Sequence, residues 1–245
     1  MKEIMIRAFT SAAAAVFAMS TMVSAASFSL DLTGAEFTSI PGGLEGDQAD
    51  TPSNAILEEL QLGFQDPGNN DLYTVNGWQG AQVLFSGGKV RVELMGWEAG
   101  FNNSFTLDGQ TVGKGLNGLS GDSPVVASDV NTPLDEFVTG VLGAGVLDFS
   151  FISERRNGNP AGGVDNGSNP VTGQNFFVAF DGHFADDAPG ATRGKTLWVF
   201  YDDSGVGNDN HDDLVIRISS IPLPAGAVLL LTGLGALAVR RRKAA

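Results

Sequence analysis

Cysteine is absent from this chain of 245 residues, and histidine occurs only at His183 and His211. Without cysteine the protein has no disulfide scaffold, no zinc–thiolate site and no cysteine nucleophile. Two histidines that lie far apart in sequence do not favour a histidine-rich metal site. The sequence therefore excludes a disulfide-rich scaffold and several common classes of active site.

Basic residues are scarce, with 14 Lys and Arg against 28 Asp and Glu, for a formal net charge of −14. Six of the basic residues but only one acidic residue, Glu3, lie in the two end segments, 1–26 and 220–245. The remaining body carries eight basic and 27 acidic residues, a net charge of −19. Such a body repels nucleic acid and anionic lipid headgroups, so nucleic acid is not a predicted partner, whereas divalent cations are attracted.

The residues that are abundant point to a globular domain rich in turns. Hydrophobic residues make up 42% of the chain, which is too many for a disordered protein. There are 33 glycines, together with frequent Asn and Asp, and this composition favours many short strands joined by turns. The length suits one domain with a substantial core.

Alternating apolar residues predict strands along the whole body. Phe28, Leu30 and Leu32 share one face of a strand, and Val90, Val92 and Leu94 share one face of another, with Glu93 on the outward side. Further strands are expected in segments 146–152, 175–182, 196–202 and 213–219. The prediction is an all-β fold, a single antiparallel β-sandwich or jelly roll at residues 27–219.

Other segments of the body are predicted to be turns, a loop and short helices. Gly87 and Gly88 indicate a hairpin, and the polar segment 157–170 reads as a long surface loop. Segments 53–60 and 132–140 are expected to form short helices.

The N-terminal segment 1–26 has the three parts of a secretory signal peptide. Lys2 and Arg7 form a positive region, residues 8–19 are apolar, and small residues follow. Cleavage is expected after Ala25 or Ala26. The alternative is a buried N-terminal helix.

The C-terminal segment 220–245 has a second targeting pattern. Residues 221–239 are an uncharged run of 19 residues, and four basic residues follow, Arg240, Arg241, Arg242 and Lys243. A run of this length can cross a bilayer as a helix, and the basic cluster is expected to stay on the cytoplasmic side. The alternative is a buried core helix.

This tail resembles the C-terminal sorting signal of exosortase-processed bacterial surface proteins, in its Val-Pro-Leu-Pro-Ala variant with Ile221 in place of the first Val. The motif Pro222, Leu223, Pro224 and Ala225 precedes the apolar run and the basic cluster in the same order. The resemblance covers about 25 residues. It implies processing by signal peptidase and by an exosortase-type enzyme, an inner-membrane intermediate held by the helix, and export to the surface or matrix of a Gram-negative bacterium.

Two stretches of the body, 96–105 and 208–219, are similar to segments of exosortase-sorted secreted β-domains. The second stretch also resembles the Asp-rich ending of a wider group of extracellular β-sandwich domains. This resemblance supports the fold expected above.

The acidic turn around 201–213 is the main candidate for a metal site. Calcium binds six to eight oxygens from carboxylates, amides and carbonyls on a flexible loop, and glycines let this chain bend. The candidate ligands are Asp202, Asp203, Asn208, Asp209, Asn210, Asp212 and Asp213. The alternative is a solvated hairpin loop in which these residues serve turn geometry.

Three further patterns bear on ligands and catalysis. Trp78 and Trp97 flank turns and can stack on sugar rings if exposed, or plug the ends of the sandwich, whereas Trp198 is expected in the core. Residues 113–118 match G-x-G-x-x-G and 86–89 match S-x-x-K, but neither has the strand and helix context that the motif needs. Glu93, Glu98 and Glu154 are the only glutamates near the central strands from which a hydrolase could draw an acid and a base.

The function expected from the sequence is a structural or adhesive role at the cell surface or within exopolysaccharide, with calcium as a possible stabiliser and no catalytic residues. The first alternative is a carbohydrate-binding module associated with exopolysaccharide, and the second is a secreted hydrolase.

Overall fold

The fold is built from antiparallel strands. The computed structural model describes residues 26–40, 60, 62, 64–66, 69–97, 100–116, 119, 125–184, 190–203 and 213–222. Every strand pair in these residues is antiparallel. Their one helix is a short 3-10 helix, η1 (Asn166–Ser168). The predicted all-β class is confirmed, whereas the single sandwich or jelly roll stays a prediction.

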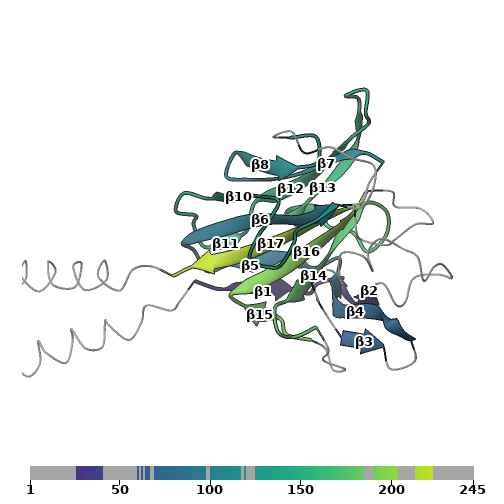
Figure 1. Cartoon of the computed structure of the whole chain (residues 1–245). Helices are drawn as coiled ribbons and strands as arrows, with labels where there is room; N and C mark the ends of the chain where they lie inside the picture. Colours follow the sequence, from purple (N-terminus) through teal and green to yellow (C-terminus); the bar gives the residue numbers. More distant parts are fainter. Residues whose placement is uncertain are drawn as a thin grey trace, which may run out of the picture. The chain divides into compact units, whose positions relative to one another are not determined.

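A nine-stranded sheet forms the centre of the domain, in the order β10-β6-β17-β16-β14-β4-β2, with β3 beside β4 and β9 beside β6 (Figure 1). Its strands are β2 (Glu36–Ile40), β3 (Phe64–Asp66), β4 (Asn69–Gln79), β6 (Lys89–Trp97), β9 (Val125–Val126), β10 (Asp135–Val138), β14 (Asn175–Phe180), β16 (Thr196–Asp202) and β17 (Leu214–Ile221).

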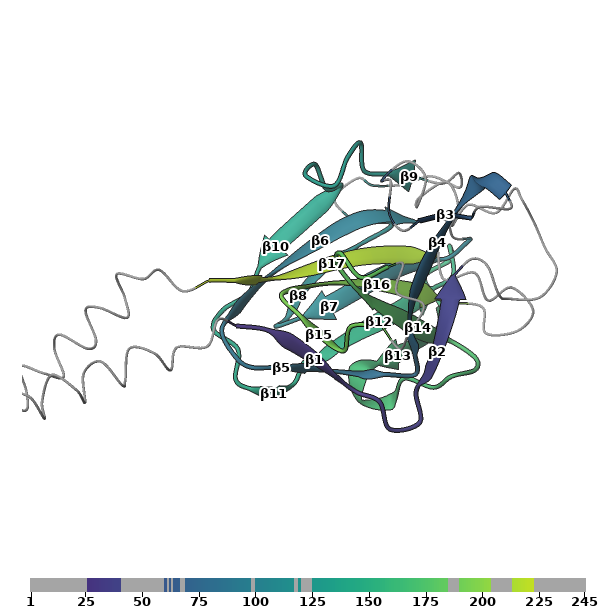
Figure 2. The same cartoon turned by 90° about the horizontal axis from the view of Figure 1, so that it is seen from below.

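Two four-stranded sheets accompany the large sheet (Figures 1 and 2). The first has the order β11-β5-β1-β15, from β1 (Phe28–Asp31), β5 (Gln82–Phe85), β11 (Gly145–Val146) and β15 (Arg193–Gly194). The second has the order β13-β12-β7-β8, from β7 (Asn102–Leu107), β8 (Gln110–Gly113), β12 (Phe149–Glu154) and β13 (Pro160–Asp165), and lies above β6 in Figure 1.

The main core lies on one face of the large sheet and includes the inward residues of both small sheets. Phe176 on β14 and Tyr201 on β16 belong to the same buried cluster as Phe28 of the first small sheet and Phe105 and Phe151 of the second. Phe151 stacks on Tyr201 with ring centroids 4.5 Å apart. Burial of such rings is a large apolar contribution to folding.

The opposite face of the large sheet is also buried. Trp198, Phe200 and Phe177 form a second cluster there, to which Leu60 and Leu62 contribute. This second cluster explains why the alternation predicted for β6 fails on one side: Glu93, expected to face solvent, is only 3% exposed. Strands covered on both faces carry almost continuous apolar runs.

The segment 132–140, expected as a short helix, contains strand β10 instead. Phe137 pairs with Val92 of β6, and the N–H groups of Leu134 and Thr139 donate to the carbonyls of Leu94 and Val90. The helix prediction is wrong because the free edge of β6 offers a ladder of hydrogen bonds that local propensity does not report. The helix predicted at 53–60 lies outside the described residues except for Leu60.

Gly87 and Gly88, expected to turn a hairpin, instead connect two different sheets, since β5 and β6 do not pair with each other. Both glycines have positive φ, 96° and 126°, which explains why glycine stands there. A true two-residue hairpin occurs at Asp108–Gly109, where both φ values are positive and Leu107 pairs with Gln110.

Segment 157–170, expected as a surface loop, contains β13 and η1 and ties the sheets together. Asn166 is 1% exposed; its Oδ1 accepts from the Val83 N–H, and its Nδ2 donates to the carbonyls of Val83 and Leu147, each at 2.7 Å. Asn169 bonds both backbone groups of Phe176 on β14 at 2.9 Å. The loop prediction is wrong because the side-chain amides of Asn166 and Asn169 serve as hydrogen-bond partners for backbone groups of other strands and segments.

Both ends of the compact unit Ala26–Ile221 leave from one pole. Ile221 pairs with Lys89, and a Cβ added to Gly88 would come within 3.3 Å of the Ala26 Cβ. β1 begins and β17 ends at the left of Figures 1 and 2. The β16–β17 connection lies at the far end of β17, about 25 Å away for a strand of this length. Among the described residues no helix combines the length and the apolar character needed to cross a bilayer.

We expect Asn166→Ala to lower the free energy of unfolding by about 3 kcal/mol or more, because three buried backbone groups lose their partners and each costs about 1–3 kcal/mol. Urea unfolding measures the change. Asn166→Asp is also expected to destabilise, since a carboxylate would face two carbonyls. The control Asn157→Ala, at an exposed turn, should stay within about 0.5 kcal/mol of the wild type. Equal effects at both positions would contradict the structural role of Asn166.

Candidate functional site

The predicted sorting motif begins directly after the domain. Pro222 follows the last residue of β17 and is exposed. Leu223, Pro224, Ala225 and the basic cluster Arg240, Arg241, Arg242 and Lys243 lie outside the described residues, as does the predicted signal peptide up to Ala25. Both targeting segments therefore stay predictions.

Three residues of the predicted acidic turn lie in the interior. Asp202 ends β16, Asp203 follows it, and Asp213 precedes β17; they are 0%, 5% and 7% exposed. Asn208, Asp209, Asn210 and Asp212 lie outside the described residues. The three described aspartates are thus buried at the base of the turn rather than solvated, and Asp213 accepts from the Asp203 N–H, which is the structural role that the hairpin alternative allows.

A group of interacting residues holds this base, at the end of the domain opposite Ala26 and Ile221. We call this group the pole network. It consists of Asn103, Lys114, Gln174, Asp203 and Asp213. The Asp203 N–H donates to Asp213 Oδ2 at 2.7 Å, and Asn103 Nδ2 donates to Asp203 Oδ2 at 2.5 Å and to the Asp213 carbonyl at 3.4 Å. Gln174 Nε2 donates to the Asp203 carbonyl at 2.5 Å. The turn is thereby fastened to β7 and to the segment before β14.

The sequence analysis did not single out Asn103 and Lys114. The signal available for Asn103 is its register, because it continues the inward series of Phe105 and Leu107 on β7. An amide in the place of an apolar residue in such a series indicates a buried polar contact. No equivalent signal marks Lys114, which is 5% exposed after the end of β8.

Burial dominates the electrostatics of the pole network. It raises the pKa of Asp203, and the charge of Asp202 acts in the same direction, whereas the Asn103 and Asp213 hydrogen bonds and the charge of Lys114 oppose the rise. Burial also raises the pKa of Tyr201, whose hydroxyl shares a 2.8 Å hydrogen bond with Ser153. Burial therefore opposes ionisation of both groups.

The described residues do not bring three metal-ligating side chains together. No group of three or more His, Asp or Glu residues among them has the arrangement of a metal site. Because four of the seven predicted ligands lie outside the described part of the chain, calcium binding stays a prediction.

The predicted calcium site requires a thermal midpoint that rises with calcium. A ligand present at a hundredfold excess over its Kd, and bound only to the folded state, adds about 2.7 kcal/mol of stability. The measurement is thermal unfolding in EDTA and in millimolar calcium. The Asp209→Asn and Asp213→Asn variants should lose the increase. An unchanged midpoint in the wild type would remove calcium from the account.

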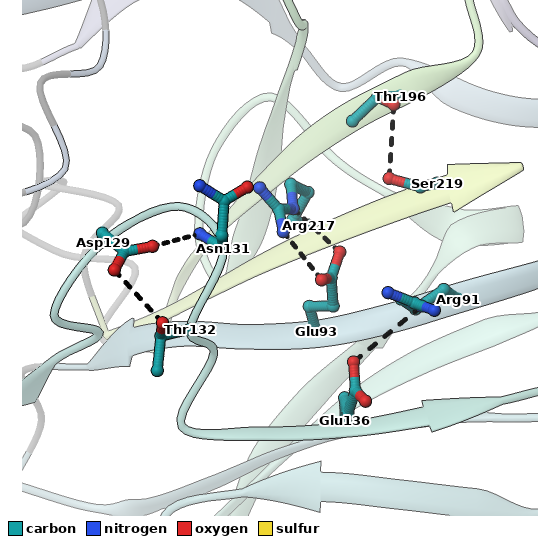
Figure 3. Close-up of polar contacts among 9 residues, drawn as sticks. All are labelled: Arg91, Glu93, Asp129, Asn131, Thr132, Glu136, Thr196, Arg217 and Ser219. Atoms are coloured by element: carbon teal, nitrogen blue, oxygen red, sulfur yellow. Dashed lines mark hydrogen bonds and ion pairs between the residues drawn. The ribbon is translucent and has the colours of Figure 1, made fainter.

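A second polar cluster crosses the large sheet on the face of Trp198 (Figure 3). Arg217 of β17 forms a two-pronged ion pair with Glu93 of β6, with distances of 2.7 and 2.8 Å. The Arg217 guanidinium also lies 5.5 Å from the centre of the Trp198 ring. Both charged side chains are largely buried, at 14% and 4% exposure, so each depends on the other.

Figure 3 also shows a part-buried hydrogen bond between Thr196 and Ser219, and two sets of contacts at the surface. Glu136 is the cross-strand neighbour of Glu93 and faces Arg91 at 3.9 Å, and both side chains are about half exposed. Asp129 accepts from the Asn131 N–H and the Thr132 hydroxyl and so shapes the turn before β10. Glu93 and Glu136 are adjacent carboxylates in different environments, the arrangement that a hydrolase would need. Both oxygens of Glu93 are bound by Arg217, however, and this contact suits a structural ion pair.

The tryptophans predicted to stack on glycans are buried. Trp78 is 8% exposed and packs edge-on against Phe37, and Trp97 is 1% exposed within the main core. The exposure that stacking on a sugar requires is therefore missing at both positions, and of the two alternatives the burial agrees with rings packed inside the domain. Trp198 is 1% exposed, as expected for a core residue. The physical reason is that both faces of the large sheet are covered.

Comparison with known proteins adds no relative: the chain matches no family model, no curated protein and no solved structure.

We expect Glu93→Gln and Arg217→Met each to lower the free energy of unfolding by about 3 kcal/mol or more, because either change leaves a buried partner charge uncompensated. The double variant Glu93→Gln with Arg217→Met should lose less than the sum, since no charge is then left alone. Urea unfolding of the three variants gives the coupling. The matched control is the exposed pair: Arg91→Met should cost about 1 kcal/mol or less. Additive losses at Glu93 and Arg217 would contradict the ion pair.

Proposed function

We propose that this chain is an exported β-sandwich protein with a structural or adhesive role at the surface, or in the exopolysaccharide matrix, of a Gram-negative bacterium. The observation that carries the proposal is the tail, in which Pro-Leu-Pro-Ala, an apolar run and a basic cluster follow one another. Signal peptidase removes the first segment. The tail then holds the chain in the inner membrane until an exosortase-type enzyme cuts near Pro222–Ala225.

We further propose that the three sheets together form a single sandwich. It is supported by the main core, in which residues of both small sheets pack against one face of the large sheet. In such an arrangement the two small sheets together act as the second layer. The loop residues Leu60 and Leu62 then cover the outer face of the large sheet, on which the second cluster lies.

The buried polar residues support a structural role. Asn166 and Asn169 complete backbone hydrogen bonds between strands, and Glu93 with Arg217 joins β6 to β17. These side chains therefore hold neighbouring strands together. A carbohydrate-binding module is not proposed, because the rings of Trp78 and Trp97 are buried.

The positions of the domain ends suit delivery by the tail. Ala26 and Ile221 lie at the same pole, beside Gly88 and Lys89, so the segments that follow from each leave the domain at one end. The acidic β16–β17 turn then lies at the pole farthest from the attachment point. A body of charge −19 stays soluble in a hydrated matrix and gathers divalent cations there.

The test is processing in a Gram-negative host that carries an exosortase. The full-length chain is expected to lose its tail and to appear outside the cell, whereas a variant with Pro222→Ala and Pro224→Ala should remain in the membrane fraction at its uncut mass. Intact mass and cell fractionation report both outcomes. Arg155→Ala, which removes an exposed charge next to Glu154, the β12 partner of Asn102, should be processed normally. An uncut wild-type tail in this host, equal to that in a host without the enzyme, would overturn the proposal.

A further inference from the structure

The pole network contains an amine, an amide and a carboxyl group in one buried place. Asn103 lies on β7, and Lys114 lies opposite it, directly after β8. Ser104 pairs with Gly113, and the Lys114 N–H donates to the Asn103 carbonyl at 2.9 Å. Phe105 and its partner Val112 point into the main core. Asn103 is two residues from Phe105, and Lys114 is two residues from Val112. Both side chains therefore face the same side of the sheet as Phe105 and Val112.

The distance between the two side chains suits a reaction between them. Cross-strand neighbours on one face have Cβ atoms about 5 Å apart, which is within the reach of a lysine side chain. Asn103 is 0% exposed and Lys114 is 5% exposed. A buried lysine amine that can reach an amide carbon is a nucleophile within reach of an electrophile.

Asp203 supplies the third group. Its Oδ2 lies 2.5 Å from Nδ2 of the Asn103 amide, and Asp203 is 5% exposed. Lys114 is the cross-strand neighbour of Asn103, whose amide contacts this carboxyl, so its side chain starts on the same face as the contact. The acid can therefore exchange a proton with the amine and polarise the amide.

An unpaired atom marks the same place. Asn103 Oδ1 is fully buried and has no hydrogen-bond partner in the described part of the chain. A buried carbonyl oxygen without a donor is costly, so its presence at this place calls for an explanation beyond a structural contact.

We propose that Lys114 and Asn103 form an intramolecular isopeptide bond, with Asp203 as the proton-transfer group. The Lys114 Nζ, in its neutral form, attacks Cγ of Asn103 and a new Nζ–Cγ bond forms. The Cγ–Nδ2 bond breaks, and Nδ2 takes up one proton from Nζ through the Asp203 carboxyl and leaves as ammonia. The amine and the primary amide become a secondary amide and ammonia, and Asp203 ends as it began.

The surroundings favour this reaction. Phe151 stacks on Tyr201, whose hydroxyl is bonded to Ser153, and Ser153 is the neighbour of Asn103 on β12. These residues keep water from the amide, which disfavours hydrolysis. The product also removes a lysine charge from the interior. Because the closed loop is short, the bond mainly prevents fraying of the pole and adds modestly to global stability.

The test is a digest of the purified full-length chain after it has been unfolded in urea. Lys114 is the only Lys or Arg between Arg91 and Arg155, so trypsin reports directly on its amine. We expect an uncut peptide 92–155 whose mass is lower than the sequence mass by one ammonia. Fragmentation by mass spectrometry should give no backbone cleavage products between 103 and 114, because the bond closes that loop.

Matched variants separate the reaction from a buried ion pair. Lys114→Arg keeps the charge, and Asp203→Asn keeps the shape, and both should restore the full peptide mass; Asp203→Asn should also restore cleavage after Lys114. Lys195→Arg should still show the ammonia loss. Far-ultraviolet circular dichroism shows that each variant is folded, and Asn103→Ala serves as a second variant if one is not.

Two results would overturn the proposal. The first is wild-type protein cut completely after Lys114, with peptides 92–114 and 115–155 at full mass, which is the outcome for an ion pair. The second is an ammonia loss with Lys114 still cleavable, which indicates cyclisation of an asparagine. The bond forms inside the folded domain, so neither result depends on whether the tail is processed and the proposed function is tested separately.

Discussion

Burial of the large sheet on both faces is the constraint on which the rest of this structure depends. The adjacent strands β6, β17, β16 and β14 carry apolar side chains to the main core on one side and to the cluster around Trp198 on the other. Any polar group on these strands must therefore be paired inside the protein. This requirement accounts for the ion pair of Glu93 with Arg217, and for the amides that complete the backbone hydrogen bonds.

The same constraint concentrates polar chemistry at one end of the sheet. Where β16 ends and β17 begins, Asp202, Asp203 and Asp213 are drawn into the interior, and Asn103 and Lys114 meet them from β7 and β8. Burial at this end of the sheet raises the pKa of Asp203. The packing of the strands places an amine, an amide and an acid there. The opposite pole holds both ends of the domain, beside Gly88 and Lys89.

Local periodicity was a sound guide where one face of a strand meets the core. Leu147, Phe149 and Phe151 are buried as their spacing indicates, and β14, β16 and β17 lie where apolar runs predict them. It failed where the partner is distant in sequence. Segment 132–140 joins the edge of β6, and Glu93 and Trp97 are covered by elements that their own neighbourhoods do not reveal.

The sequence by itself determined the all-β class, most of the long strands and the charge of the body, because alternation and composition act over a few residues. The targeting segments are also legible only in the sequence. Tertiary structure alone decided that Gly87 and Gly88 join two sheets, that Asn166 bridges strands, and that Asn103, Lys114 and Asp203 meet. Those contacts join residues up to about 100 positions apart, and only packing of the sheets brings such residues together.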